Sequence, residues 1–204
     1  LFSIDYMKHY GAKANYYALF LIMIAGMNGL VLVTDLFDIY LFLEVAAIAS
    51  YALVAYGLEH DELEASFKYL MLSVIASSFV LVGIAVLFGM TGSLSFEGVA
   101  RGLQAVDGKA VVGLCSALFI MGFGLKAALV PFHAWLPDAH PSAPAPISAM
   151  LSGLLIKVSG LYALTRIFFH VFGLTPALSG VLMWLAAVSL VAAAVTALGP
   201  HDMK

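Results

Sequence analysis

Three ionisable side chains lie inside apolar stretches of this sequence. Glu44 is flanked by LFL and VAAIA, Lys126 by GFGL and AALV, and Lys157 by GLLI and VSGLY. A charge at the centre of a membrane helix costs about 2.5–3.5 kcal/mol, so three unpaired charges would cost on the order of 8–10 kcal/mol. We therefore expect all three to face a common polar interior. A Glu–Lys pair that opens and closes there changes the proton affinity of the lysine, which is the physical requirement of a proton relay.

A proline follows Lys126 by five residues. Pro131 has no backbone N–H to donate, so it should break or kink the helix that carries Lys126. Such a break is tolerated in a membrane only where protein or a water-lined cavity satisfies the freed backbone groups. The next segment, residues 132–146, places His133 and His140 among four prolines. The sequence thus predicts a discontinuous helix beside a buried lysine.

Other kinds of site find little support. Metal ligation requires clusters of His, Cys or carboxylate side chains, and two histidines in a proline-rich loop have no helical spacing that favours it. No glycine-rich phosphate loop follows a strand, and no nucleophile–base arrangement is recognisable. Cys115 is the single cysteine and lies in an apolar run, which favours a small core residue over a disulfide. We expect neither a metal nor a bound cofactor in this chain.

The composition indicates a membrane protein. Of the 204 residues, 63% are hydrophobic and 10% are charged, whereas a soluble domain carries about 25% charged residues. The apolar runs reach the length of about 20 residues that spans a bilayer, which disfavours the alternative of a large soluble protein with buried helices. The net charge is −3 without a basic block, so nucleic-acid binding is not expected.

Six apolar segments define the predicted architecture. We expect spans at residues 15–33, 35–57, 63–90, 111 to the break near 131, 147–170 and 177–198. Residues 1–14 should form an interfacial lead-in, and residues 91–110 a surface loop with a short amphipathic helix at 96–106. Thr34, Asp35 and Asp38 mark the turn before the second span. Because the chain opens on Leu1 and stops just after a predicted helix, we expect it to be part of a longer protein.

Position alone does not decide the role of Lys68. It lies within the first two turns of the third span, where interfacial snorkelling and a functional role are equally compatible with its position. The preceding segment LEHDELEAS is acidic and should be solvated. Lysine and arginine do not orient the chain, because three of these charges fall on each side of alternating helices.

The residues around the predicted break resemble a family signature. GLKAALVPFHAWLPDAHPSAPAPISAMLSG, with a second lysine about 30 residues after the first, is similar to the antiporter-like subunits of respiratory complex I (NADH:quinone oxidoreductase). Membrane-bound hydrogenases and multisubunit cation/proton antiporters share this subunit type. The resemblance extends to DLFDIYLFLEVAAIASYALVAYG, EASFKYLMLS and the terminal HDMK, and so covers nearly the whole chain.

The resemblance implies roles for the residues at matching positions. Glu44 matches the family's buried glutamate and Lys126 the central lysine on its broken helix. Lys157 matches the lysine that is assigned to carrying protons towards the next half-channel. Lys68 matches a lysine near the glutamate, which favours a functional role over snorkelling. Candidate relay members after the break are His133 and His140.

The resemblance also implies a fold, which is all-α and polytopic, with about six spans. The family consists of two inverted five-helix repeats, each with a broken helix. Residues 15–170 would form the first repeat and residues 177–204 the first helix of the second, within a single, incomplete membrane domain (1–204). Without the second half-channel, this chain should not complete a transmembrane path. The lead-in and the acidic loop would face the cytoplasm.

These expectations describe a non-redox subunit that translocates protons, or Na⁺, across a prokaryotic cell membrane together with other membrane subunits. It would belong to an enzyme only as the pumping part of a translocase of the NADH:quinone oxidoreductase or hydrogenase type, with flavin, iron–sulfur and quinone in partner subunits. A subunit of a Na⁺/H⁺ antiporter without a redox partner stays open, as do the coupled ion and the electron donor. A non-conducting scaffold is disfavoured, because it gains nothing from mid-span charges.

Overall fold

The computed structural model describes residues 2–9, 11, 13–105 and 109–198. A short helix, α1 (Phe2–Tyr6), and a 3₁₀ turn (Met7–His9) precede the long helices. The long helices are α2 (Lys13–Leu32), α3 (Leu36–Val54), α4 (His60–Thr91), α6 (Lys109–Lys126) and α10 (Pro176–Thr196). Shorter helices are α5 (Phe96–Ala105), α7 (Leu136–Ser142), α8 (Ala145–Met150) and α9 (Ala163–Ile167). In these described ranges no strand forms, and one isolated bridge pairs Asp35 with Ser95.

The prediction of an all-α, polytopic membrane protein is confirmed. In the described part of the chain, six helical segments are long and apolar enough to span a membrane: 13–32, 36–54, 60–91, 109–126, 145–172 and 176–196. The short helix predicted at 96–106 is present as α5, apart from Val106, which lies outside the described residues. The HDMK motif at 201–204 also lies outside them. The division into a repeat at 15–170 and a second repeat that begins at 177 stays a prediction.

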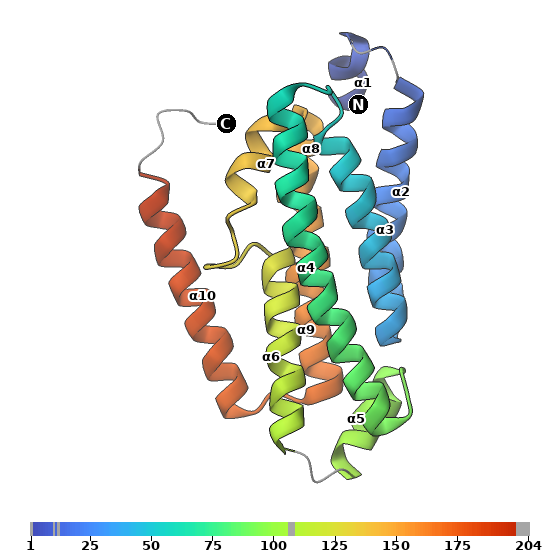
Figure 1. The fold of residues 1–204 in the computed structure, drawn as a ribbon, viewed down its shortest axis with the longest axis vertical. Helices are drawn as coiled ribbons and strands as arrows, with labels where there is room; N and C mark the ends of the chain where they lie inside the picture. The colour runs from blue at the N-terminus through green and yellow to red at the C-terminus, as the bar shows by residue number, and fades with distance from the viewer. Residues whose placement is uncertain (1, 10, 12, 106–108, 199–204) are drawn as a thin grey trace.

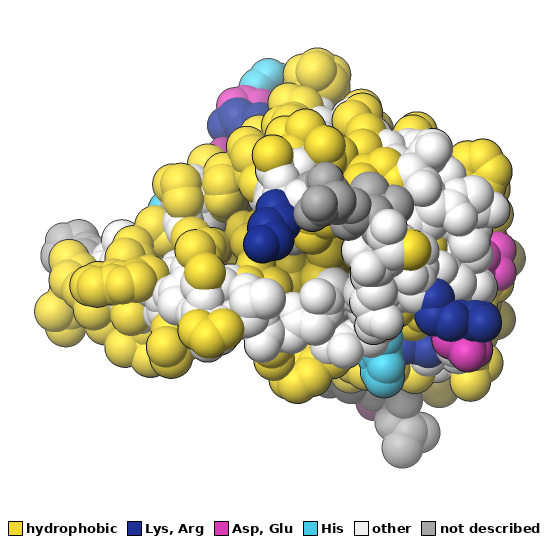
Figure 2. Space-filling model, turned by 90° about the horizontal axis from the view of Figure 1, so that it is seen from below, with side chains coloured by type: hydrophobic (Ala, Val, Ile, Leu, Met, Phe, Trp, Pro, Cys, Tyr) yellow, Lys and Arg dark blue, Asp and Glu magenta, His cyan; other side chains and the backbone are white. Residues whose placement is uncertain are grey.

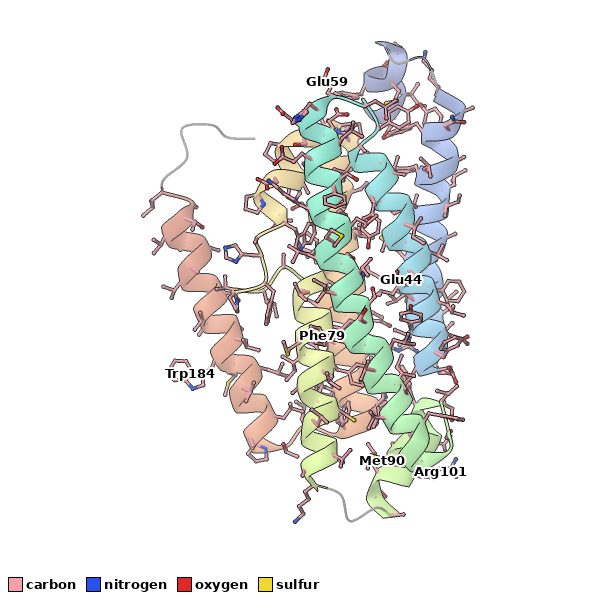
Figure 3. The ribbon with its side chains drawn as sticks, in the orientation of Figure 1. Glu44, Glu59, Phe79, Met90, Arg101 and Trp184 are labelled. Carbon is pink, nitrogen blue, oxygen red and sulfur yellow. The ribbon has the colours of Figure 1, made fainter. Side chains whose placement is uncertain are left out.

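The helices form a bundle in which α2 packs along α3, α3 along α4, and α4 along α6 (Figure 1). The short helices α1, α7 and α8 lie at one end of the bundle and α5 lies at the other. Helix α10 leans away from the rest, and none of its residues is buried. Its Trp184 is 74% exposed and points away from the bundle (Figure 3). One surface of α10 therefore stands free of the other helices in this chain.

Local sequence features account for how the long helices begin and how closely they pack. Asp35 caps α3, because its carboxylate accepts hydrogen bonds from Phe37 N at 2.8 Å and Asp38 N at 3.3 Å. Gly122 allows α6 to approach α4, since a Cβ there would lie 2.6 Å from Val80 Cγ2. Small residues at such crossings are typical of membrane helices. This close crossing brings the end of α6 against α4.

The predicted helix break begins earlier than expected. Helix α6 ends at Lys126 itself, five residues before Pro131, and the Val130–Pro131 peptide bond is cis. The following span, predicted as an ordinary helix over 147–170, runs over 145–172 and alternates α-helical with π-helical turns at Leu151–Leu155, Lys157–Tyr162 and Phe168–Phe172. Such π-helical turns are rare, and they occur often at functional sites.

Candidate functional site

The buried charges of α3 and α6 meet in the interior of the bundle. Lys126 Nζ lies 3.4 Å from Glu44 Oε1, and the two side chains are 4% and 23% exposed. Figure 3 places Glu44 between the ends of the bundle that Glu59 and Arg101 mark. The two charges offset each other at a depth where either one alone would be costly. Part of the expected common interior is therefore present.

Two serines of α4 complete the polar contacts of this pair. Lys126 Nζ donates to Ser73 Oγ at 2.5 Å, and Ser77 Oγ donates to Glu44 Oε1. Ser73 and Ser77 are themselves 4% and 5% exposed. Because they are four residues apart, they lie on the same face of α4. The four side chains form a continuous hydrogen-bonded cluster, which we call the Glu44–Lys126 cluster.

The C-terminal end of α6 holds Lys126 in place from the other side. The last carbonyl groups of a helix lack partners within it, and here Trp135 Nε1 donates to Leu125 O at 3.0 Å. The Trp135 ring is 2% exposed and stacks on Tyr69 of α4, with the ring centroids 4.2 Å apart. A helix C-terminus carries a partial negative charge that favours a nearby cation. The break thus stabilises the positive charge of Lys126.

The π-helical segment after the break packs directly against the residue that follows Lys126. A Cβ added at Gly160 would lie 2.5 Å from Ala127 Cα and 2.6 Å from Ala127 N. Only a glycine allows this approach of the two backbones. Since Ala127 follows Lys126 directly, the contact fixes the position of the lysine backbone relative to the 145–172 segment.

The structure does not bring Lys157 into the same interior, and that part of the prediction is wrong for this chain. Lys157 is exposed, and its Nζ donates to the backbone carbonyl of Ser152. Its neighbours Ser159 and Gly160 are buried. Small residues occupy the face of this segment that packs on α6, so the lysine lies on the surface of the segment.

Lys68 joins α4 to the loop after the break, and its ion pairs do not include Glu44. Its Nζ lies 2.9 Å from Glu64 Oε1 and 2.9 Å from Asp138 Oδ2 of α7, and its side chain is 47% exposed. Lys68 lies nine residues before Ser77 on α4, which is roughly 13 Å along a helix. Asp138, which is not among the predicted site residues, is the partner that joins α7 to α4.

The two histidines of the loop have different surroundings. His140 Nδ1 lies 2.8 Å from Ser148 Oγ, and burial together with the positive charge of Lys157 lowers the pKa of His140. His133 Nδ1 is buried and has no hydrogen-bond partner among the described residues. Among all the residues that the structure describes, no group of three or more His, Cys, Asp or Glu residues could hold a metal ion. His140 and Lys157 are therefore electrostatically coupled near the surface.

Comparison with known proteins matches residues 33–204 to the family model described as NADH:quinone oxidoreductase/Mrp antiporter, transmembrane. The chain is 37% identical over 195 residues to an NADH-quinone oxidoreductase subunit of Desulforudis audaxviator, and the match covers 94% of this chain and 38% of the relative. It is 33% identical over 193 residues to a Na(+)/H(+) antiporter subunit of Alkalihalophilus pseudofirmus, and that match covers 94% and 39%.

A solved structure is also similar over most of this chain. A chain of the membrane-bound sulfane sulfur reductase, an archaeal respiratory membrane complex, superimposes with a TM-score of 0.80 at 37% identity. The match covers 88% of this chain and 36% of that one. The sequence therefore spans about two fifths of the length of the relatives it matches.

Proposed function

Because this chain belongs to the NADH:quinone oxidoreductase/Mrp antiporter transmembrane family, we propose that it translocates protons as an antiporter-like subunit of a larger membrane complex. The observation that carries the proposal is the buried Lys126–Glu44 ion pair, which lies at the end of a broken membrane helix. Six spans and bacterial relatives make the chain a multi-pass protein of the prokaryotic plasma membrane.

In the proposed mechanism, Lys126 carries the proton and Glu44 controls how tightly the lysine holds it. While the pair is closed, the carboxylate stabilises the ammonium group. When the pair opens, the desolvated lysine releases its proton more readily. The two groups face each other directly, while Ser73 Oγ accepts from the ammonium group and Ser77 Oγ donates to the carboxylate. The cluster can therefore pass a proton without moving a charged side chain far.

The remaining candidates continue the path towards the surface. Lys68 and Asp138 form the ion pair above the cluster, and His140 lies close enough to Lys157 to respond to its charge. Lys157 would pass protons to a second half-channel in the rest of a longer protein, and His133 has a buried ring nitrogen available for water or a proton. These residues form two separate pairs that an exit route would have to join, and flavin, iron–sulfur and quinone would reside in partner subunits.

A direct test replaces Lys126 with alanine in the full-length protein in its native assembly. We expect the complex to assemble and proton translocation into vesicles to be largely lost. Lys109→Ala is the matched control, because this exposed lysine begins the same helix and lies outside the cluster. Unchanged translocation by the Lys126 variant would rule out the relay.

The second candidate function is that of a Na⁺/H⁺ antiporter subunit with no redox partner. It is favoured by the 33% identity to the antiporter relative, which approaches the 37% identity to the oxidoreductase relative. Purification of the full-length protein from its native membrane separates the two. Flavin and iron–sulfur absorption with electron transfer from NADH or hydrogen would identify a redox-driven pump, whereas a colourless assembly with Na⁺/H⁺ exchange would identify an antiporter.

A further inference from the structure

A cavity separate from the Glu44–Lys126 cluster lies at the end of the bundle that carries α5. It has a volume of about 490 Å³ and is lined from three separate segments by residues that include Phe96, Glu97, Arg101, Gln104, Arg166 and His170. Figure 2 views this end and shows basic, acidic and histidine side chains close together along one edge. These charged side chains gather at the part of this end where the cavity lies.

Arg166 brings a positive charge to the cavity and forms no ion pair with a described carboxylate. Its Nη1 donates to Leu30 O at 3.2 Å and to Val31 O at 2.9 Å, and its guanidinium carbon lies 5.2 Å from the Phe96 ring centroid. Among the described residues, no Asp or Glu lies within ion-pair distance of it. The guanidinium N–H groups beyond Nη1 have no protein acceptor there either. Arg166 can therefore still bind an anion.

The second arginine is only weakly engaged. Arg101 Nη2 lies 3.4 Å from Glu97 Oε1, and these side chains are 72% and 83% exposed. Such an exposed pair contributes little, so Arg101 can exchange Glu97 for another acceptor. Two guanidinium groups and one carboxylate leave an excess of positive charge at the cavity. A phosphate group matches two guanidinium groups, because its oxygens accept bidentate hydrogen bonds.

The surroundings of the cavity are those of a membrane interface. Helix α5 buries Phe96 and Val99 and directs Arg101 outwards, which is the pattern of an amphipathic helix that lies in the interface. Leu32, at the end of α2 and two residues before Thr34 of the lining, is 77% exposed, and Tyr162 is 39% exposed beside Arg166. A ligand with both an anionic group and an apolar part would contact the arginines of the cavity and the exposed apolar side chains at the same time.

We propose that this cavity binds the phosphate headgroup of an anionic phospholipid, with Arg101 and Arg166 as its ligands and the acyl chains along the exposed apolar end of α2. Two guanidinium groups recognise the phosphate of such a headgroup, because its oxygens accept bidentate hydrogen bonds. A free phosphate would share the arginine contacts, but it would leave the adjacent apolar surface uncovered. The lipid therefore fits the whole site better than the ion.

The test uses the full-length protein in its native assembly, placed in nanodiscs with equal amounts of phosphatidylglycerol and phosphatidylcholine. Native mass spectrometry after release measures which lipid is retained. We expect retention of phosphatidylglycerol, and about a fivefold weaker affinity in Arg101→Gln, the effect of one basic residue at a membrane surface. Lys109→Gln is the matched control, because this exposed lysine lies at the same end and does not line the cavity.

A further variant, Arg166→Lys, preserves the positive charge but cannot form bidentate hydrogen bonds, and it should also weaken the retention of phosphatidylglycerol. Equal retention of the two lipids, or an equal loss in Lys109→Gln, would overturn the proposal. Competition by inorganic phosphate at the same concentration as the lipid would reduce the site to a simple anion site and overturn the lipid assignment. Cross-linking of the cavity to an acidic side chain of a neighbouring subunit would do the same.

Discussion

Gly160→Ala should impair proton translocation although it changes no charge. The added Cβ would lie 2.5 Å from Ala127 Cα and 2.6 Å from Ala127 N. Since favourable carbon–carbon contacts begin near 3.5 Å, the two backbones must separate by roughly 1 Å. The displaced residue follows Lys126 directly, so the substitution moves the lysine relative to Glu44 and Ser73.

The size of the effect follows from this displacement. Inserting a methyl group into a packed interior costs about 1–3 kcal/mol, which reduces stability without abolishing the fold. A misplacement of about 1 Å at a reacting group can lower the rate about 100-fold. The Lys126–Glu44 distance is 3.4 Å before the substitution, so such a shift separates the pair. We expect an assembled protein whose translocation falls at least tenfold.

The assay is proton uptake into inverted vesicles, normalised to the amount of assembled complex. Gly153→Ala is the matched control, because Gly153 lies in the same π-helical region and a Cβ there meets nothing within 4 Å. The control should translocate normally. Full activity of the Gly160 variant, or an equal loss in the Gly153 variant, would refute the view that the backbone contact positions the lysine.

Three further changes test other contacts. Ser77→Ala removes the hydroxyl donor to the buried carboxylate, a bond worth about 1.5–3 kcal/mol, so translocation in vesicles should fall and Ser77→Thr should restore it. Trp135→Phe keeps an aromatic ring but removes the N–H that donates to Leu125 O. Because Leu125 O also accepts from Ala128 N at 3.1 Å, the free energy of unfolding should fall by about 0.5–1.5 kcal/mol, the net contribution of one hydrogen bond. Because the pKa of His140 is lowered from its ordinary value of 6.5, the unfolded chain takes up a proton first as the pH falls. The thermal midpoint of unfolding should therefore fall as the pH drops from about 6.5 to the lowered pKa of His140. His140→Gln should make this fall smaller.

Each of these expectations has an outcome that contradicts it. Normal pumping by Ser77→Ala would assign that hydroxyl to packing alone. An unchanged unfolding free energy in Trp135→Phe would mean that water caps the helix end equally well. If His140→Gln kept the full pH dependence of the thermal midpoint, another group would be responsible for it.

Much of the fold could be predicted, because the apolar runs and their end signals are local features. Asp35 predicted the start of the second span, and α3 begins at Leu36 directly after it. The predicted span at 177–198 corresponds to α10 at Pro176–Thr196. The π-helical turns of the 145–172 segment were not predicted. They accompany the close packing of Gly160 on Ala127, a contact between residues 33 positions apart in the sequence.

The site was predictable only in part, and the missing parts are tertiary. The cost of burying charge predicted that Glu44 and Lys126 would meet, and they do. Ser73 and Ser77 were missed, because serine in an apolar helix usually bonds back to its own backbone. Their spacing of four residues, on the helix that lies between the two charges, is the signal that could have found them.

The early end of α6 explains why a lysine can remain at this depth. If the helix continued to Pro131, Lys126 would lie in its interior, where the backbone carbonyls are already paired. Because α6 ends at Lys126, the negative end of the helix dipole lies at the lysine residue and not several residues beyond it. Glu44 contributes the rest of the compensation. The same break therefore ends α6 at the lysine and, through the close contact of Gly160 with Ala127, fixes where the lysine backbone lies.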